Sequence, residues 1–166
     1  MFLRVLVASI VALPCLVVAA PALGRAPVAS PCASGNVATT ASYRMALDIG
    51  KQEEMYLPSE VKARHIKEGE IMLGGDMSMV DKQPGKRIYH VEIHICTKTG
   101  AVVTKLNPAI VVGSATLPSA IMVGIGEPIS DYHYGNDIAL KPGTRVTVSV
   151  TVKGQRAVFH ATVPKT

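Results

Sequence analysis

Hydrophobic and polar residues alternate along much of the chain after position 41, with the period of strands that have one buried face. The clearest runs are Ser42–Gly50, Ile88–Cys96, Thr144–Val152 and Arg156–Val163. Only Ser59–His65, which follows Pro58, favours a helix, of two turns at most. Seven or eight short strands with one short helix in the N-terminal third predict an all-β fold, an antiparallel β-sandwich of immunoglobulin-like type.

The first residues have a different pattern. A short, positively charged start is followed by the apolar run Val5–Val18 and then by small residues up to Gly24. This order is typical of a secretory signal peptide, and the alternative is an uncleaved N-terminal anchor. We therefore expect a signal peptide at 1–24, a flexible leader rich in Pro, Ala and Ser at 25–40, and a single sandwich domain at 41–166. The mature chain has no other run suited to crossing a bilayer, so we expect a periplasmic or secreted protein.

The cysteines support this interpretation. Cleavage would remove Cys15 and leave Cys32 and Cys96, an even pair in an oxidising compartment. A disulfide between them would exclude Cys96 from ligating a metal. We favour the disulfide, although Cys32 lies in a tract whose geometry the sequence leaves open.

The charge distribution and the absence of known motifs argue against two classes of function. The net charge of +5 is scattered, and Trp is absent, so nucleic-acid binding is not expected. None of the common hydrolase, zinc-protease or nucleotide-binding motifs occurs in the chain. We therefore do not expect an enzyme.

The strand Ile88–Cys96 contains the main candidate site. Its alternation places His90, Glu92, His94 and Cys96 on one face. His90 and His94 would lie about 13 Å apart along a strand that rises near 3.3 Å per residue, so they cannot easily share an ion. Glu92 could share an ion with either histidine. The other interpretation is the ordinary solvated face of an antiparallel sheet.

Further candidate ligands come from two other segments. His133 lies between two tyrosines in a loop, and Met122 precedes it by eleven residues; alternatively, these are a solvated histidine and a core methionine. Met77 and Met79 lie on a glycine-bounded loop before the histidine strand. This Met pair is either a site for Cu(I) or a cover for the end of the sandwich.

The segments HVEIHI and HYGNDI, with a methionine between them, resemble the periplasmic iron- and copper-binding immunoglobulin-like proteins of bacterial high-affinity iron transport. The resemblance covers roughly Tyr89 to Val152. It implies His90, Glu92 and His133 as ligands, with Met122 as a looser match, and a homodimer with the site near the subunit interface. The chain departs from that family in the long spacing between Met122 and His133. It also departs in the position of His160, which lies inside a strand.

Together these features predict an exported protein that binds copper or iron and is accessory to metal transport or homeostasis in the cell envelope. His90 and His133 would supply nitrogen, and Glu92 a carboxylate that suits iron. Met122, or Met77 with Met79, would supply soft sulfur for copper. The alternative is a non-catalytic immunoglobulin-like interaction module, in which the polar strand face contacts a partner protein.

Overall fold

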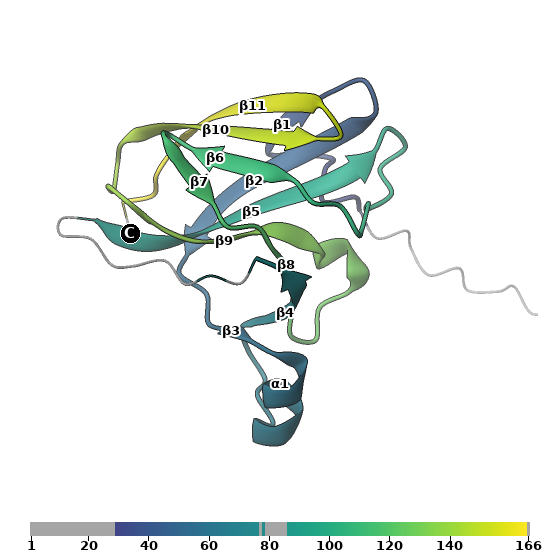
Figure 1. Cartoon of the computed structure of the whole chain (residues 1–166), viewed down its shortest axis with the longest axis vertical. Helices are drawn as coiled ribbons and strands as arrows, with labels where there is room; N and C mark the ends of the chain where they lie inside the picture. Colours follow the sequence, from purple (N-terminus) through teal and green to yellow (C-terminus); the bar gives the residue numbers. More distant parts are fainter. Residues whose placement is uncertain (1–28, 77, 79–85, 166) are drawn as a thin grey trace, which may run out of the picture.

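The computed structural model describes residues 29–76, 78 and 86–165. Within them the chain forms two β-sheets and one α-helix (Figure 1). The strands are β1 (Asn36–Thr39), β2 (Tyr43–Lys51), β3 (Met55–Tyr56), β4 (Glu70–Gly75), β5 (Arg87–Thr97), β6 (Ala109–Val112), β7 (Ala115–Leu117), β8 (Ala120–Gly124), β9 (His133–Leu140), β10 (Arg145–Val152) and β11 (Gln155–Thr162). The helix α1 spans Pro58–Arg64, and a 3₁₀ turn, η1, spans Ile129–Asp131.

Seven strands form the larger sheet in the order β1-β2-β5-β9-β8-β4-β3, and four form the smaller one in the order β11-β10-β6-β7. The smaller sheet covers the β2, β5 and β9 part of the larger one, whereas β8, β4 and β3 continue away from it toward α1 (Figure 1). The predicted all-β fold is confirmed. The immunoglobulin-like arrangement of the strands stays a prediction. The described residues hold more than the seven or eight strands expected, because β1, β3 and β7 are too short to give a sequence period.

The core fills the space between the sheets. Alternate residues of β5, among them Val91, Ile93 and Ile95, are fully buried and pack with Val148 and Val150 of the facing sheet. The long central strand β5 pairs antiparallel with β2 on one side and β9 on the other. Because successive side chains point to opposite faces, the same pairing holds the polar residues of β5 on the outer face of the sheet.

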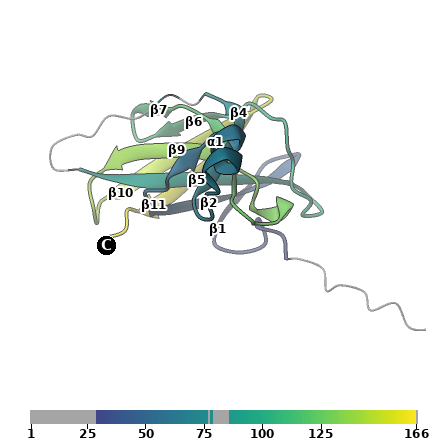
Figure 2. The same cartoon turned by 90° about the horizontal axis from the view of Figure 1, so that it is seen from below.

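The predicted helix is present within one residue of its expected bounds. Pro58 occupies its first turn, and the Leu57 amide donates to the Glu60 carboxylate at 2.8 Å, half of a capping box. His65 ends the helix with φ of 52°. None of its residues is buried. Figure 2 views the molecule from the α1 end, so that the helix lies in front of the strands.

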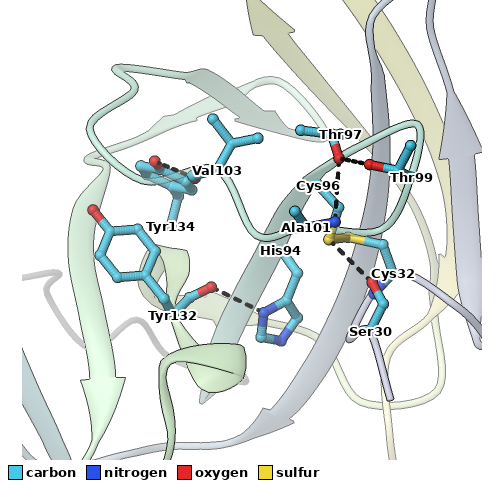
Figure 3. The surroundings of a disulfide bond; sticks show 10 residues. All are labelled: Ser30, Cys32, His94, Cys96, Thr97, Thr99, Ala101, Val103, Tyr132 and Tyr134. Carbon is cyan, nitrogen blue, oxygen red and sulfur yellow. Dashed lines mark hydrogen bonds between the residues drawn. A yellow bond between two sulfur atoms is a disulfide. The ribbon is translucent and has the colours of Figure 1, made fainter. Parts of the chain in front are cut away.

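Part of the predicted leader belongs to the fold. Residues Asn36–Thr39 pair with β2, and Cys32 forms a disulfide with Cys96 at the end of β5 (Figure 3). The Ser30 hydroxyl lies 3.5 Å from Cys96 Sγ. The disulfide confirms the favoured prediction and removes Cys96 from the candidate ligands. The ordered domain therefore begins earlier than residue 41, because the disulfide and a sheet edge anchor the tract.

The run from 109 to 126 contains three strands, because Gly113 with φ of 63° allows a tight turn between β6 and β7. The expected signal peptide and the pair Met77 and Met79 lie outside the described residues. In the described part of the chain, no helix has the length and apolar character to cross a membrane.

Candidate metal centre

The outer face of the larger sheet carries a line of metal-capable side chains contributed by four strands. On β5 these are His90, Glu92 and His94. Strand register places His90 opposite Asp137 and Glu92 opposite Gly135, while His133 begins β9. Met122 of β8 is the register partner of His133. Residues paired in this way have side chains on the same face, so separate segments of the sequence meet there.

His90 and His133 are in contact at the centre of this face. Their Nε2 atoms are 3.4 Å apart and their rings meet edge to face, although their positions in the register differ by several residues. The two rings therefore lean toward each other across the Glu92–Gly135 pair. A Cβ at Gly135 would lie 1.8 Å from the Val91 carbonyl oxygen, so only glycine fits there. Both histidines are fully buried.

His94 joins the same group from the other side. Its ring centroid is 5.6 Å from that of His133, and its Nε2 atom is 3.6 Å from Glu92 Oε2. The spacing along β5 does separate His94 from His90, as expected. His133, supplied by the neighbouring strand, lies in contact with both rings. A third histidine is thus part of the cluster, which the spacing argument alone did not reveal.

The Nδ1 atom of each of the three histidine rings lies within hydrogen-bond distance of an oxygen atom. His90 Nδ1 lies 2.9 Å from Asp137 Oδ1, His94 Nδ1 donates to the Tyr132 carbonyl at 3.1 Å, and His133 Nδ1 donates to the Asp131 carbonyl at 2.7 Å. Figure 3 shows the His94–Tyr132 bond beside the disulfide. A proton on Nδ1 leaves the Nε2 lone pair free for a metal, and metal-binding histidines commonly have such outer partners.

Glu70, at the start of β4, lies at one end of the cluster. Its Oε2 atom is 3.9 Å from His133 Nε2 and has no hydrogen-bond partner among the described residues. The residue is 8% exposed. Ligand atoms of Glu70, Asp131 and His133 all lie within 4.8 Å of one another, so these three could hold a metal ion. Asp131 also accepts a bond of 2.6 Å from the Gly124 amide.

Burial and charge shift the pKa values of the cluster. Burial raises the pKa of Glu70 to about 7, and the negative charge of Asp131 adds to the effect. Burial lowers the pKa of His133. Burial also acts to lower the pKa of His90, but its bond to Asp137 and the charge of Glu92 outweigh this and raise it. For Glu92, burial acts to raise the pKa, but the bond to His94 and the charges of the other histidines lower it overall. One histidine with a raised pKa, one with a lowered pKa and two carboxylates therefore lie side by side.

Sulfur is available on the same face. Met122 is fully buried and pairs in register with both His133 and Met72 of β4. The expectation that Met122 approaches His133 in space agrees with this register. The alternative, an ordinary core methionine, agrees with the burial of Met122. It does not agree with the face on which Met122 lies, because the core between the sheets is on the opposite face.

Sequence reasoning proposed His90, Glu92, His133 and Met122, and the structure brings these four to one face. Two further members of the group, Glu70 and Asp131, were not predicted, and His94 was placed on this face but was not included in the proposed ligand set. The alternation in IYHVEIHIC already indicated that His94 shares the face of Glu92. Nothing local marks Glu70 or Asp131, because their proximity depends on the pairing of β4 with β8.

The fold and this cluster together define a two-sheet β protein with a buried group of histidines and carboxylates suited to a metal ion. Comparison of the chain with protein-family models, with curated proteins and with solved structures finds no match. The function is therefore argued from the site.

Proposed function

We propose that this protein binds a transition-metal ion, copper or iron, in an extracytoplasmic compartment and serves metal transport or homeostasis by coordination, not turnover. One observation carries the proposal. Three imidazoles, His90, His94 and His133, have Nδ1 tied to oxygen acceptors while Nε2 faces the cluster that contains Glu92 and Glu70. Bonds from Nδ1 orient each imidazole so that Nε2 points at other potential ligand atoms, as is common for metal-binding histidines.

The chemistry of the donors supports copper and iron. Imidazole accepts Cu(II), Fe and Zn, and carboxylate favours the harder Fe ion. A buried thioether such as Met122 favours Cu(I). Among divalent ions at one site of this kind, the general order of affinity places Cu(II) above Fe(II). We expect the same order here.

The proposed compartment rests on the disulfide. Cys32–Cys96 persists only under oxidising conditions, which are found outside the cytoplasm. A homodimer with the site near its interface, and an envelope transport component as partner, belong to the same proposal through the resemblance described above.

The direct test is titration of metal-stripped protein with Cu(II), Cu(I) and Fe(II) in competition with chelators of known affinity. His133→Ala should lose at least tenfold in affinity, since removing one ligand of a metal centre costs more than removing its outer partner. His160→Ala is the matched control: His160 is exposed on β11, in the other sheet, and its ring nitrogen lies 3.3 Å from the Thr147 hydroxyl. Absence of stoichiometric binding, or equal behaviour of the two variants, would refute the proposal.

A further inference from the structure

A second feature lies next to the metal cluster and is not explained by coordination. A pocket of about 390 Å³ opens at the end of β4 and β8. Its wall holds five carboxylates and one lysine: Glu53, Glu68, Glu70, Glu127, Asp131 and Lys67. The whole chain has a net charge of +5, so this concentration of acid runs against the charge of the molecule. We call it the acidic vestibule.

The vestibule borders the buried histidines. Glu70 and Asp131 line the pocket, and ligand atoms of both lie within 4.8 Å of a ligand atom of His133. Glu70 is more than nine-tenths buried, and its Oε2 atom has no hydrogen-bond partner in the described part of the chain. A buried carboxylate without a partner is costly, and a cation beside Glu70 would offset that cost.

Two glycines keep the vestibule open. A Cβ at Gly124 would lie 2.8 Å from Glu127 Cγ and 2.9 Å from Asp131 Oδ2, so glycine is what allows both acids to lie over the end of β8. Gly69 has φ of 101°, and a Cβ there would lie 2.5 Å from the Glu54 carbonyl oxygen. Any side chain at either position would displace the acids or the turn that carries them.

We infer that the metal reaches the histidines through the acidic vestibule as a free hydrated cation and not as an anionic chelate. This rests on the proposed function and adds the chemical class of the cargo. A pocket lined by one sign of charge raises the local concentration of the opposite ion and accelerates its binding. The same field repels a negatively charged complex, such as a metal citrate.

The test measures the rate of loading. Cu(II) chloride in a non-coordinating buffer is mixed rapidly with metal-stripped protein, and binding is followed by quenching of tyrosine fluorescence. The chain has no Trp, and two of its five tyrosines, Tyr132 and Tyr134, flank His133, so copper at the site should quench part of the emission. The variant is Glu68→Gln/Glu127→Gln, which removes two exposed vestibule charges outside the metal cluster. The control is Glu60→Gln/Asp76→Asn, which removes two charges elsewhere and keeps an acceptor oxygen at each position.

In about 10 mM salt the vestibule variant should bind Cu(II) roughly 3- to 10-fold more slowly than the wild type, within the range for electrostatic steering. The control should bind at the wild-type rate, and the difference should vanish near 0.5 M salt. Wild-type protein should also load more slowly from copper citrate than from the chloride, and the variant should lose part of that preference. Equal rates and equal salt dependence in both variants would overturn the inference alone. Failure of the wild type to bind Cu(II) would instead refute the proposed function.

Discussion

The carboxyl group of Glu70 is buried beside His133 and near Asp131, and burial raises its pKa to about 7. A carboxyl in an unfolded chain titrates near 4.3, so the folded protein holds the Glu70 proton more tightly than the unfolded chain does. Any stabilisation from this proton is therefore complete below about pH 4 and is lost as the pH rises toward 7. Above pH 7 the metal-free fold contains an ionised, buried carboxylate whose natural partner would be a cation.

Glu70→Gln should therefore stabilise the metal-free protein at pH 8 and change its stability little at pH 4.5. Glutamine keeps the size of the side chain but cannot ionise. Thermal unfolding of chelator-treated protein at the two pH values, followed by circular dichroism, measures the effect as a difference in Tm. Glu68→Gln, an exposed neighbour in the vestibule, serves as the control. The same rise in Tm at both pH values would contradict the assignment of the effect to ionisation.

Asp137 acts on the site through His90. Its carboxylate lies 2.9 Å from His90 Nδ1, and both residues are buried. Asp137→Asn removes the charge that favours a proton on Nδ1, so metal affinity should fall about 10- to 100-fold, as is typical for outer partners of ligating histidines. Metal titration measures it. Asp76→Asn is the control, because Asp76 is exposed and lies outside the histidine cluster. Unchanged affinity in Asp137→Asn would remove His90 from the coordination proposal.

Single elements differ in how far the sequence predicts them. Strands β5, β10 and β11 and the helix α1 carry a full local signal, either strict alternation or a proline-led turn, and their bounds agree with expectation within a few residues. Strands β1, β3 and β7 have two to four residues each, which is too short for a period. They exist because a neighbouring edge was available for pairing, which no local pattern encodes.

The site residues also differ in how far the sequence predicts their common location. His90, Glu92 and His94 lie on one strand, so alternation alone predicts their common face. That His133 and Met122 join them depends on the pairing of β9 with β5 and β8. Periodicity does not group them, and the family resemblance that did so stays a prediction. The positions of Glu70 and Asp131 near His133 depend on the pairing of β4 with β8, and no local sequence pattern marks either residue.

The disulfide should stabilise the elements that it joins. Cys32→Ser/Cys96→Ser should lower the free energy of unfolding by about 2–4 kcal/mol, the usual range for a cross-link over a long loop. Equilibrium denaturation with urea, compared with the wild type with and without reductant, measures the loss. The disulfide joins the segment before β1 to the end of β5. Without it, the backbone amides of β1 and of the end of β5 should also lose protection from hydrogen exchange. A variant as stable as the oxidised wild type would contradict this prediction.

At the scale of the whole molecule, an ion bound at the proposed site should act as a stabilising ligand. A metal that binds only the folded state adds about 2.7 kcal/mol when its free concentration is a hundred times the Kd. The Tm of the protein should rise with Cu(II) and return to its starting value after a chelator is added. His133→Ala should show a much smaller rise, and His160→Ala a full one. If the Tm of the wild type did not change on addition of Cu(II), this would count against a metal site on the folded protein.

The strand order of the larger sheet has a kinetic consequence. Strand β2 pairs with β5, and β4 with β8, across long stretches of chain, whereas β10 and β11 are joined by a tight turn. Contacts between distant segments form slowly, because the loop must close before the contact is gained. The hairpin should fold early, and the face that holds the histidines should be completed among the last events. Metal should therefore leave the refolding rate nearly unchanged and slow unfolding, so that a protein loaded once keeps its ion for as long as its last-formed strands stay paired.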